Sequence, residues 1–192
     1  MTFKATTLLS LLLLISGCST APIAPGCTQL GRGGQFCLLA PAALPAVSAS
    51  HLVTLVRIGR QDTFMGLLRI DAHALRLAGF SLFGTNLFTI EYDGHAISSE
   101  PKHGDWHPEL LVAMLELVVA DPAMLQPRLH KLTLTLSTRG NTQVRELFEH
   151  GRLVARIEET GTPLSQARIR IEIPPARITL QMTPIAASMA PP

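Results

Sequence analysis

Apolar and polar residues alternate with a period of two over most of the chain, the pattern of β-strands that bury one face. In the first such stretch Leu52, Thr54, Val56 and Ile58 share a face. All the alternating stretches, in chain order, are residues 52–58, 64–70, 76–82, 87–92, 132–137, 153–158, 168–173 and 178–183. Asp93-Gly94 adds a hairpin-turn signal before the middle of the chain. The pattern therefore predicts two groups of strands, about five in each.

The middle of the chain has helical spacing instead. His107-Pro108-Glu109 begins a helix with proline at its first position, where a missing N–H costs nothing. The apolar residues of this helix that fall on one side are Leu110, Leu111, Met114, Leu115 and Val118. Asp121-Pro122 begins a second short helix, which Pro127 should distort. We expect helices over residues 108–119 and 121–129.

The order of strands, helices and strands lacks the regular alternation of a doubly wound parallel sheet. Strands with one buried and one wet face are typical of antiparallel sheets. We therefore expect a mainly β (α+β) fold, a curved antiparallel sheet or half-barrel of about ten strands with the helices as a short lid. This domain should span residues 51–183, between an N-terminal tether at residues 18–50 and a flexible tail at residues 184–192.

The N-terminus has the features of a secretory signal at residues 1–17. Lys4 precedes an apolar run over residues 8–15 that is shorter than the ~20 residues needed to span a bilayer. The run ends in Leu14-Ile15-Ser16-Gly17-Cys18, which resembles the lipobox of bacterial lipoproteins and predicts lipidation of Cys18. In that resemblance Ser19 indicates the outer membrane, with the protein on its periplasmic face. The alternative is an ordinary signal peptide with an incidental cysteine.

Two further cysteines, Cys27 and Cys37, flank a glycine-rich stretch that can turn as a hairpin. The periplasm is oxidising, so we expect a disulfide between them, against the alternative of two free thiols. A metal site is not expected, because two isolated cysteines lack a second pair of ligands.

Charge and hydropathy limit the kind of partner. Without Lys4, the 16 basic residues become 15, against 14 acidic ones, and no basic cluster occurs. Nucleic acid is therefore not expected as a partner. Only 16% of residues are charged and the mean hydropathy is +0.30, which indicates a large core or a cavity with apolar walls.

Three segments carry a resemblance to a known family. They are residues 75–84 (LRLAGFSLFG), residues 87–94 (LFTIEYDG), and Pro108-Glu109-Leu110-Leu111 leading to Asp121-Pro122. In their order the chain resembles bacterial lipoproteins of the DUF3261 family, which are similar in fold to the LolB-like lipoprotein-localisation proteins. The resemblance implies a half-barrel with a helical lid over a hydrophobic cavity. It also implies that, in some bacteria, the gene lies near genes for the biosynthesis of lipid-like molecules or aryl polyenes.

This chain departs from the family pattern at the end of its first helix. The family often has an aromatic or Trp-Pro element there, whereas this chain has residues 119–122 (VADP). The family has no established catalytic residues, so none are carried over.

The half-barrel analogy favours a ligand cavity over a simply filled core, although periodicity alone leaves both open. The residues expected to line it are Phe64, Leu68, Phe80, Phe83, Phe88, Ile90, Trp106, Leu111, Met114, Leu134 and Leu136.

Polar motifs that could carry enzyme chemistry are weak. His103-Gly104-Asp105-Trp106-His107 has metal-binding side chains, but no further ligand is in sight, so no metal is expected. Residues 79–84 (GFSLFG) differ from a nucleophile elbow, because the second glycine comes one residue late and no helix follows. We expect no catalytic residues, no cofactor and no enzyme activity.

Together, these expectations predict that the protein is a periplasmic lipoprotein anchored to the outer membrane, and that it binds or transfers a lipid or acyl-like ligand. Lipoprotein localisation and the export of aryl polyenes or lipids are the processes that the resemblance implies. Its expected partners are the membrane, the hydrophobic ligand and a periplasmic carrier or envelope protein. The alternative is a non-catalytic scaffold of a cell-envelope assembly.

Overall fold

The computed structural model describes residues 26–101 and 107–185, and every structural statement below refers to these residues. Before the helices lie β3 (Val47–Arg57), β4 (Arg60–Ile70), β5 (Leu75–Phe80), β6 (Asn86–Tyr92) and β7 (Ile97–Glu100). After them lie β9 (Thr133–Arg139), β10 (Thr142–Glu149), β11 (Arg152–Thr160), β12 (Arg168–Ile173) and β13 (Ile178–Pro184).

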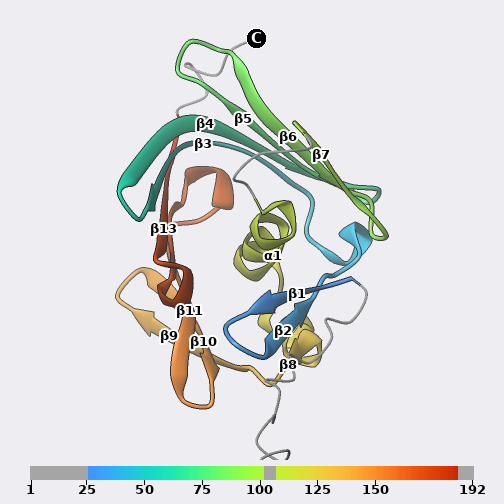
Figure 1. Ribbon diagram of the computed structural model, residues 1–192, viewed down its shortest axis with the longest axis vertical. Helices are drawn as coiled ribbons and strands as arrows, with labels where there is room; N and C mark the ends of the chain where they lie inside the picture. The colour runs from blue at the N-terminus through green and yellow to red at the C-terminus, as the bar shows by residue number, and fades with distance from the viewer. Residues whose placement is uncertain (1–25, 102–106, 186–192) are drawn as a thin grey trace, which may run out of the picture.

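These strands form one curved antiparallel sheet in the order β7-β6-β5-β4-β3-β13-β12-β11-β10-β9 (Figure 1). Each group of five is a meander, and the groups join where β3 pairs with β13. Leu55 lies opposite Leu180 in this pairing, and Val53 lies opposite Met182. The sheet is open, with β7 and β9 as its two edges. The predicted fold class and the two groups of five strands are confirmed.

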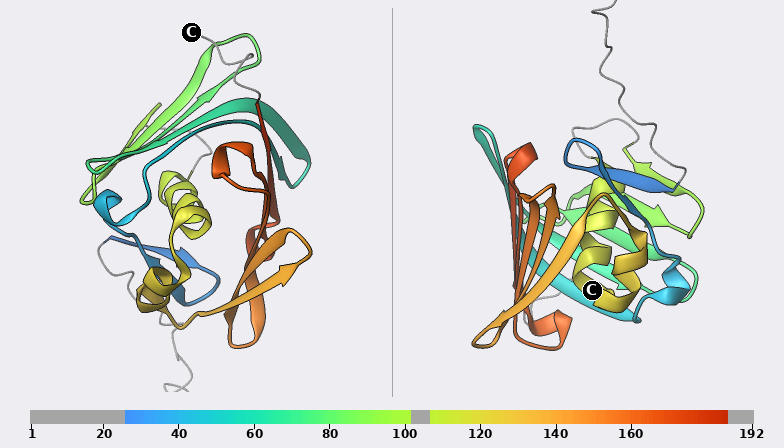
Figure 2. Two further views of the ribbon diagram at one scale, coloured as in Figure 1. Left: turned by 180° about the vertical axis from the view of Figure 1, so that it is seen from behind. Right: turned by 90° about the horizontal axis from the view of Figure 1, so that it is seen from below.

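Helix α1 (Pro108–Val119) lies inside the curve of the sheet (Figures 1 and 2). Every residue from 112 to 118 is buried, so the helix is covered on all sides. The second helix, α2 (Pro122–Leu125), begins with Asp121 accepting a hydrogen bond from the Ala123 N–H at 2.8 Å. It is shorter than predicted and gives way to a 3-10 turn at Gln126–Arg128. The physical reason is Pro127, which lacks an N–H for a continued α-helix.

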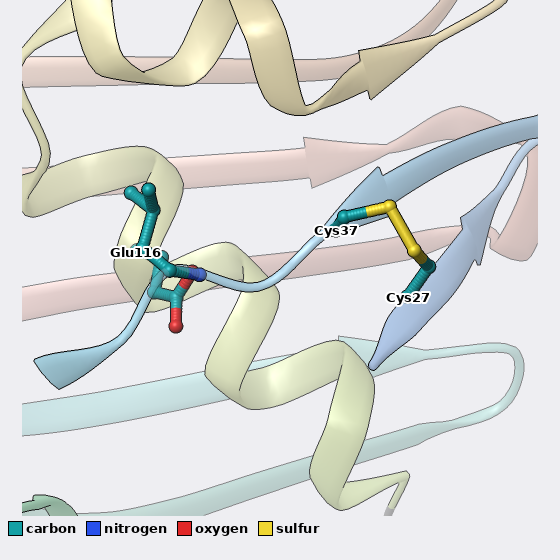
Figure 3. The surroundings of a disulfide bond; sticks show 4 residues. Cys27, Cys37 and Glu116 are labelled. Atoms are coloured by element: carbon teal, nitrogen blue, oxygen red, sulfur yellow. A yellow bond between two sulfur atoms is a disulfide. The ribbon is translucent and has the colours of Figure 1, made fainter. Parts of the chain in front are cut away.

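A small second sheet covers the other side of α1. It contains β1 (Cys27–Leu30), β2 (Gly34–Cys37) and β8 (Leu129–His130), in the order β1-β2-β8. The predicted hairpin and disulfide are confirmed, because Cys27 lies opposite Cys37 and the two are bonded. Figure 3 shows this disulfide beside α1. The helix is thus enclosed between the large sheet and the small one.

The segment before β3 is more deeply packed than a surface tether. Leu39 is 1% exposed, Leu38 and Leu44 are also buried, and β3 itself begins at Val47 rather than near residue 51. These leucines join the main core cluster, because the segment runs along the side of α1 that the large sheet leaves open. The N-terminal part of the chain therefore completes the core.

The turn of the β1–β2 hairpin is held by a distant carboxylate. Glu149, at the end of β10, accepts hydrogen bonds from the backbone N–H groups of Arg32, Gly33 and Gly34 at 2.9, 2.6 and 2.8 Å. These N–H groups favour the charged form and lower the pKa of the Glu149 carboxyl. Glu149 therefore joins the small sheet to the end of the large one.

Strand β3 buries its odd-numbered residues, not the even-numbered ones whose alternation is noted in the sequence. Leu52, Thr54 and Val56 do share a face, but it is the outer one, and Ile58 lies in the turn after β3, 71% exposed. The odd-numbered residues, including Val53 and Leu55, face α1 and the core. Both faces of this strand are largely apolar, so alternation alone could not assign them.

The C-terminal end of α1 is fixed to the large sheet by Arg145 on β10. One nitrogen of the guanidinium, Nη1, donates to the carbonyl oxygens of Leu117 and Ala120 at 2.9 and 2.7 Å. Arg145 is 9% exposed, and burial lowers its pKa. A cation at a helix C-terminus is also favoured by the helix dipole.

We expect Arg145→Met to lower the free energy of unfolding by about 2–4 kcal/mol, because two buried carbonyls lose a charged donor. Urea unfolding at neutral pH measures this change. The matched control is Arg152→Met on β11, where the side chain is exposed and the change should be within about 0.5 kcal/mol. Equal effects of the two substitutions would contradict the role assigned to Arg145.

Candidate ligand cavity

A cavity of about 80 Å³ lies between residues 110–115 of α1 and the central strands of the large sheet. Its walls come from β3, β4, β5, β6, β12, β13 and α1. Phe64 and Phe88 meet edge to face in one wall, with ring centroids 5.5 Å apart and an interplanar angle of 78°. Met114 and Leu111 supply the opposite wall from α1. The cavity thus lies where the two five-stranded groups meet beneath the helix.

The cavity wall is almost wholly apolar. Only Arg57 and His107 among its lining residues are polar. Arg57, at the end of β3, pairs with Asp62 at 3.0 Å, and His107 is exposed beside the start of α1. Such a wall can bury hydrocarbon, and its one charged side chain is already paired with a carboxylate.

The position of the Phe88 ring depends on a glycine of the neighbouring strand. Gly79 lies opposite Phe88 in the β5–β6 pairing, and a Cβ at residue 79 would overlap the ring. A register shift follows directly, between Gly79 and Phe80. The glycine therefore gives the aromatic ring room to form part of the wall.

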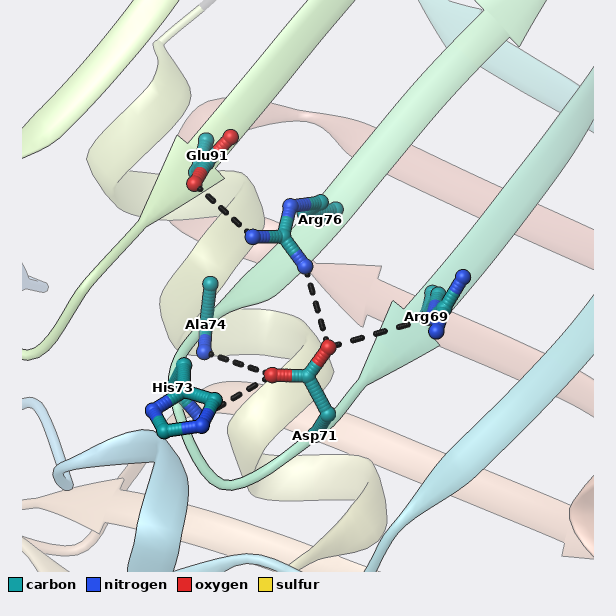
Figure 4. Close-up of polar contacts among 6 residues, drawn as sticks. All are labelled: Arg69, Asp71, His73, Ala74, Arg76 and Glu91. Carbon is teal, nitrogen blue, oxygen red and sulfur yellow. Dashed lines mark hydrogen bonds and ion pairs between the residues drawn. The ribbon is translucent and has the colours of Figure 1, made fainter.

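The largest cluster of charged side chains on this half of the sheet lies at the other end of β5 (Figure 4). Asp71, in the β4–β5 turn, accepts from the N–H groups of His73 and Ala74 at 2.9 and 3.1 Å, which lowers the pKa of its carboxyl. Arg76 bridges Asp71 and Glu91 at 3.0 and 3.2 Å. Asp71 thus closes the turn, and Arg76 links it to Glu91 on β6.

The described residues show neither a metal site nor a membrane-spanning helix. No group of three or more His, Cys, Asp or Glu within residues 26–101 and 107–185 is placed to hold a metal ion. None of the helices in those ranges is long and apolar enough to cross a bilayer. Most of the 103–107 motif lies outside the described residues.

Comparison with known families adds one match. The family described as "Protein of unknown function (DUF3261)" matches residues 48–186, which is most of the chain. The chain belongs to the DUF3261 family. The DUF3261 match spans all ten strands of the large sheet, both helices and every wall of the cavity, but not the disulfide hairpin. No curated protein matches the chain.

Four of the residues expected to line a cavity in this DUF3261 domain do lie at its wall: Phe64, Phe88, Leu111 and Met114. Leu68 and Ile90 are buried in the surrounding core, and Leu134 is partly buried against it. Phe80 is half-buried beyond the wall. Phe83 and Leu136 are exposed, at 96% and 54%, and do not line it. Trp106 lies outside the described residues, as does Cys18.

Sequence reasoning missed the part of the wall that comes from the last two strands. Ile171, Ile173, Leu180 and Met182 line the cavity, and their alternation was visible in the sequence. Their nearness to Phe64 depends on the pairing of β13 with β3, which no local pattern reveals.

A second missed residue is Glu116, the only charged residue between Leu110 and Val119. It is fully buried, and its Oε2 accepts a hydrogen bond from the Leu39 N–H at 2.8 Å (Figure 3). Its Oε1 has no hydrogen-bond partner among the described residues. Burial raises the pKa of the carboxyl from 4.5 to about 8, against the Leu39 hydrogen bond and the charge of Arg128. Glu116 is therefore neutral at pH 7 and ties the N-terminal segment to α1.

We expect the protein to lose stability as the pH rises from about 7 to about 8, the range below the raised pKa of Glu116. There the native carboxyl keeps a proton that the unfolded chain has already released, so the slope is negative, up to about 1.4 kcal/mol per pH unit. Burial also lowers the pKa of His51, which gives stability a positive slope, but only up to its ordinary value of 6.5.

Urea unfolding across this pH range tests the role of Glu116. Glu116→Gln, which mimics the neutral acid, should flatten the slope. Glu109→Gln removes an exposed carboxyl from the same helix and should leave it unchanged. An unaltered slope in Glu116→Gln would assign the titration to another group.

Proposed function

We propose that this protein is a lipid-anchored carrier on the periplasmic face of the outer membrane, which binds an acyl-like chain without chemical conversion. The observation that carries the proposal is the apolar cavity between α1 and the sheet. Each CH₂ group moved from water into such a site contributes about 0.8 kcal/mol. Several methylenes would thus give useful binding after the entropy of association is subtracted.

The size of the cavity indicates how loading would occur. At about 80 Å³ it is smaller than ordinary small-molecule sites of about 300–1,000 Å³, so it accepts only a short length of chain. A longer chain requires α1 to move away from the sheet. The polar attachments of α1 are made by Glu116, Leu117 and the C-cap residue Ala120, at its C-terminal end. The residues of α1 that line the cavity lie before them, between 110 and 115. The helix is therefore suited to open at its N-terminal end while its C-terminal end stays fixed.

The membrane anchor in this proposal is Cys18, and the signal for the outer membrane is Ser19. The cargo would be the acyl part of a lipoprotein, an aryl polyene or another lipid. Mass spectrometry of molecules that co-purify with the native protein would identify it. Recovery of a stable protein complex with an empty cavity would instead favour a scaffold role.

The anchor can be tested in the producing cells. Cys18→Ala should abolish incorporation of labelled palmitate and release the protein from the membrane fraction, because no thiol remains for acylation. Ser19→Asp should keep the label but move the protein to the inner membrane. Palmitate incorporation into Cys18→Ala would contradict the assignment of Cys18.

The cavity can be tested by displacement of a dansyl-labelled undecanoic acid. Met114→Trp should weaken binding about tenfold or more, because the larger side chain fills the space that the acyl chain needs. Met124→Trp is the matched control, since Met124 is 40% exposed on α2, away from the cavity, and should bind as the wild type does.

Thermal unfolding will show whether Met114→Trp remains folded. Leu111→Trp, at a half-buried position of the same wall, is a second way to fill the cavity. If both variants are folded and bind the fatty acid like the wild type, the cavity is not the binding site. If the wild type binds no fatty acid or other hydrophobic probe, the carrier function is wrong.

A further inference from the structure

The turn between β5 and β6 exposes the largest apolar side chains on the described surface. We call residues 81–87 the β5–β6 finger. In it Phe83 is 96% exposed, Leu82 61% and Leu87 40%. An exposed leucine is ordinary, but a fully exposed phenylalanine beside two exposed leucines indicates a surface that meets something apolar.

The backbone of the finger is closed on itself through Ser81. The Ser81 Oγ accepts from the N–H groups of Phe83 and Thr85 at 3.3 and 3.1 Å. The Gly84 N–H donates to the Ser81 carbonyl at 2.9 Å, and the Ser81 N–H donates to the Thr85 carbonyl at 2.8 Å. Polar backbone groups that enter lipid must find partners within the protein, because water is absent there. Four N–H groups of the finger therefore already have partners within the protein, those of Ser81, Phe83, Gly84 and Thr85.

Charge along the β5–β6 hairpin is separated from the finger. No residue from 77 to 90 is charged, whereas the opposite end of the hairpin carries Asp71, Arg76 and Glu91 (Figure 4). A hairpin with a charged end and an uncharged apolar end fits a boundary between water and lipid. A salt-sensitive contact with a charged partner would need basic or acidic groups at the tip.

The finger adjoins the cavity directly. Leu87 is exposed on the finger, and the next residue, Phe88, forms part of the cavity wall. The β3–β4 turn, with exposed Ile58, and the β12–β13 turn lie at the same end of the sheet, because antiparallel strands alternate in direction. The apolar finger and the cavity thus share one end of the domain.

We propose that the β5–β6 finger inserts Leu82 and Phe83 into the lipid surface, so that the cavity end of the domain faces the membrane. The inference rests on the proposed function for the anchor at Cys18. Seven residues lie between Cys18 and Gly26, where the described part begins, and this stretch reaches at most about 30 Å. An anchor at Cys18 therefore keeps the domain close to the membrane, where a small apolar contact is enough to orient it.

Tryptophan fluorescence in brominated lipid vesicles tests this orientation. The acylated full-length protein is placed in phosphatidylethanolamine and phosphatidylglycerol vesicles, with Trp106→Phe to remove the native tryptophan. Phe83→Trp should then show a blue-shifted emission that brominated lipids quench several-fold. The control is Leu136→Trp, at an exposed position of edge strand β9, whose emission should be quenched little. Quenching of Phe83→Trp should be the same at low and high salt, because the finger has no charge.

Two further variants separate this inference from the carrier function. Leu82→Ser combined with Phe83→Ser should leave binding of the dansyl fatty acid unchanged but slow its transfer to vesicles about tenfold, since an aromatic contact with lipid is lost. Met114→Trp should lose fatty-acid binding while the quenching at residue 83 persists. Quenching at residue 83 in a protein whose wild type binds no fatty acid would overturn the carrier function alone.

The membrane contact itself is overturned by either of two results. One is equal quenching, or no quenching, of the tryptophans introduced at residues 83 and 136. The other is photo-crosslinking from residue 83 in cells that yields one protein adduct in place of lipid, which would make the finger a protein-docking element.

Discussion

The pairing of β3 with β13 is the contact on which the rest of the structure depends. It joins the first long strand to the last and turns two five-stranded meanders into one sheet. The curve of that sheet holds α1, and the junction supplies both strands at the middle of the cavity wall. Without this pairing Phe64 and Leu180 would belong to separate sheets, and no enclosed apolar space would exist between them.

The polar contacts of helix α1 are concentrated toward its C-terminal end. Arg145 binds its last carbonyls, and Glu116 binds the Leu39 N–H from its middle. Both contacts are buried and polar, so each is costly to break. The first turns of α1 meet mainly apolar side chains, which can separate and repack at lower cost. In the carrier function that we propose, the C-terminal end of α1 would support the fold and its N-terminal end would open for the ligand.

The sequence predicted those features that depend on local pattern. Alternation and helical spacing located the strands and α1, and the glycine-rich stretch between Cys27 and Cys37 located the hairpin. The assignment of residues to the cavity was less complete, because it depends on which strands are neighbours. Phe83 was grouped with the lining residues for its apolar side chain, but a turn cannot direct that ring inward. Glu116 could have been noticed as the lone charge in an apolar helix, although its partner Leu39 could not.

The β3–β13 pairing also affects when the chain can fold. Leu55 cannot meet Leu180 until nearly the whole sequence has been synthesised, so the central seam of the sheet closes last. Long-range pairing of this kind makes folding slow. The ten-stranded sheet therefore stays incomplete until its C-terminal strand has been made. For the periplasmic location that we propose, an incomplete sheet would keep the chain suited to passage through an export channel.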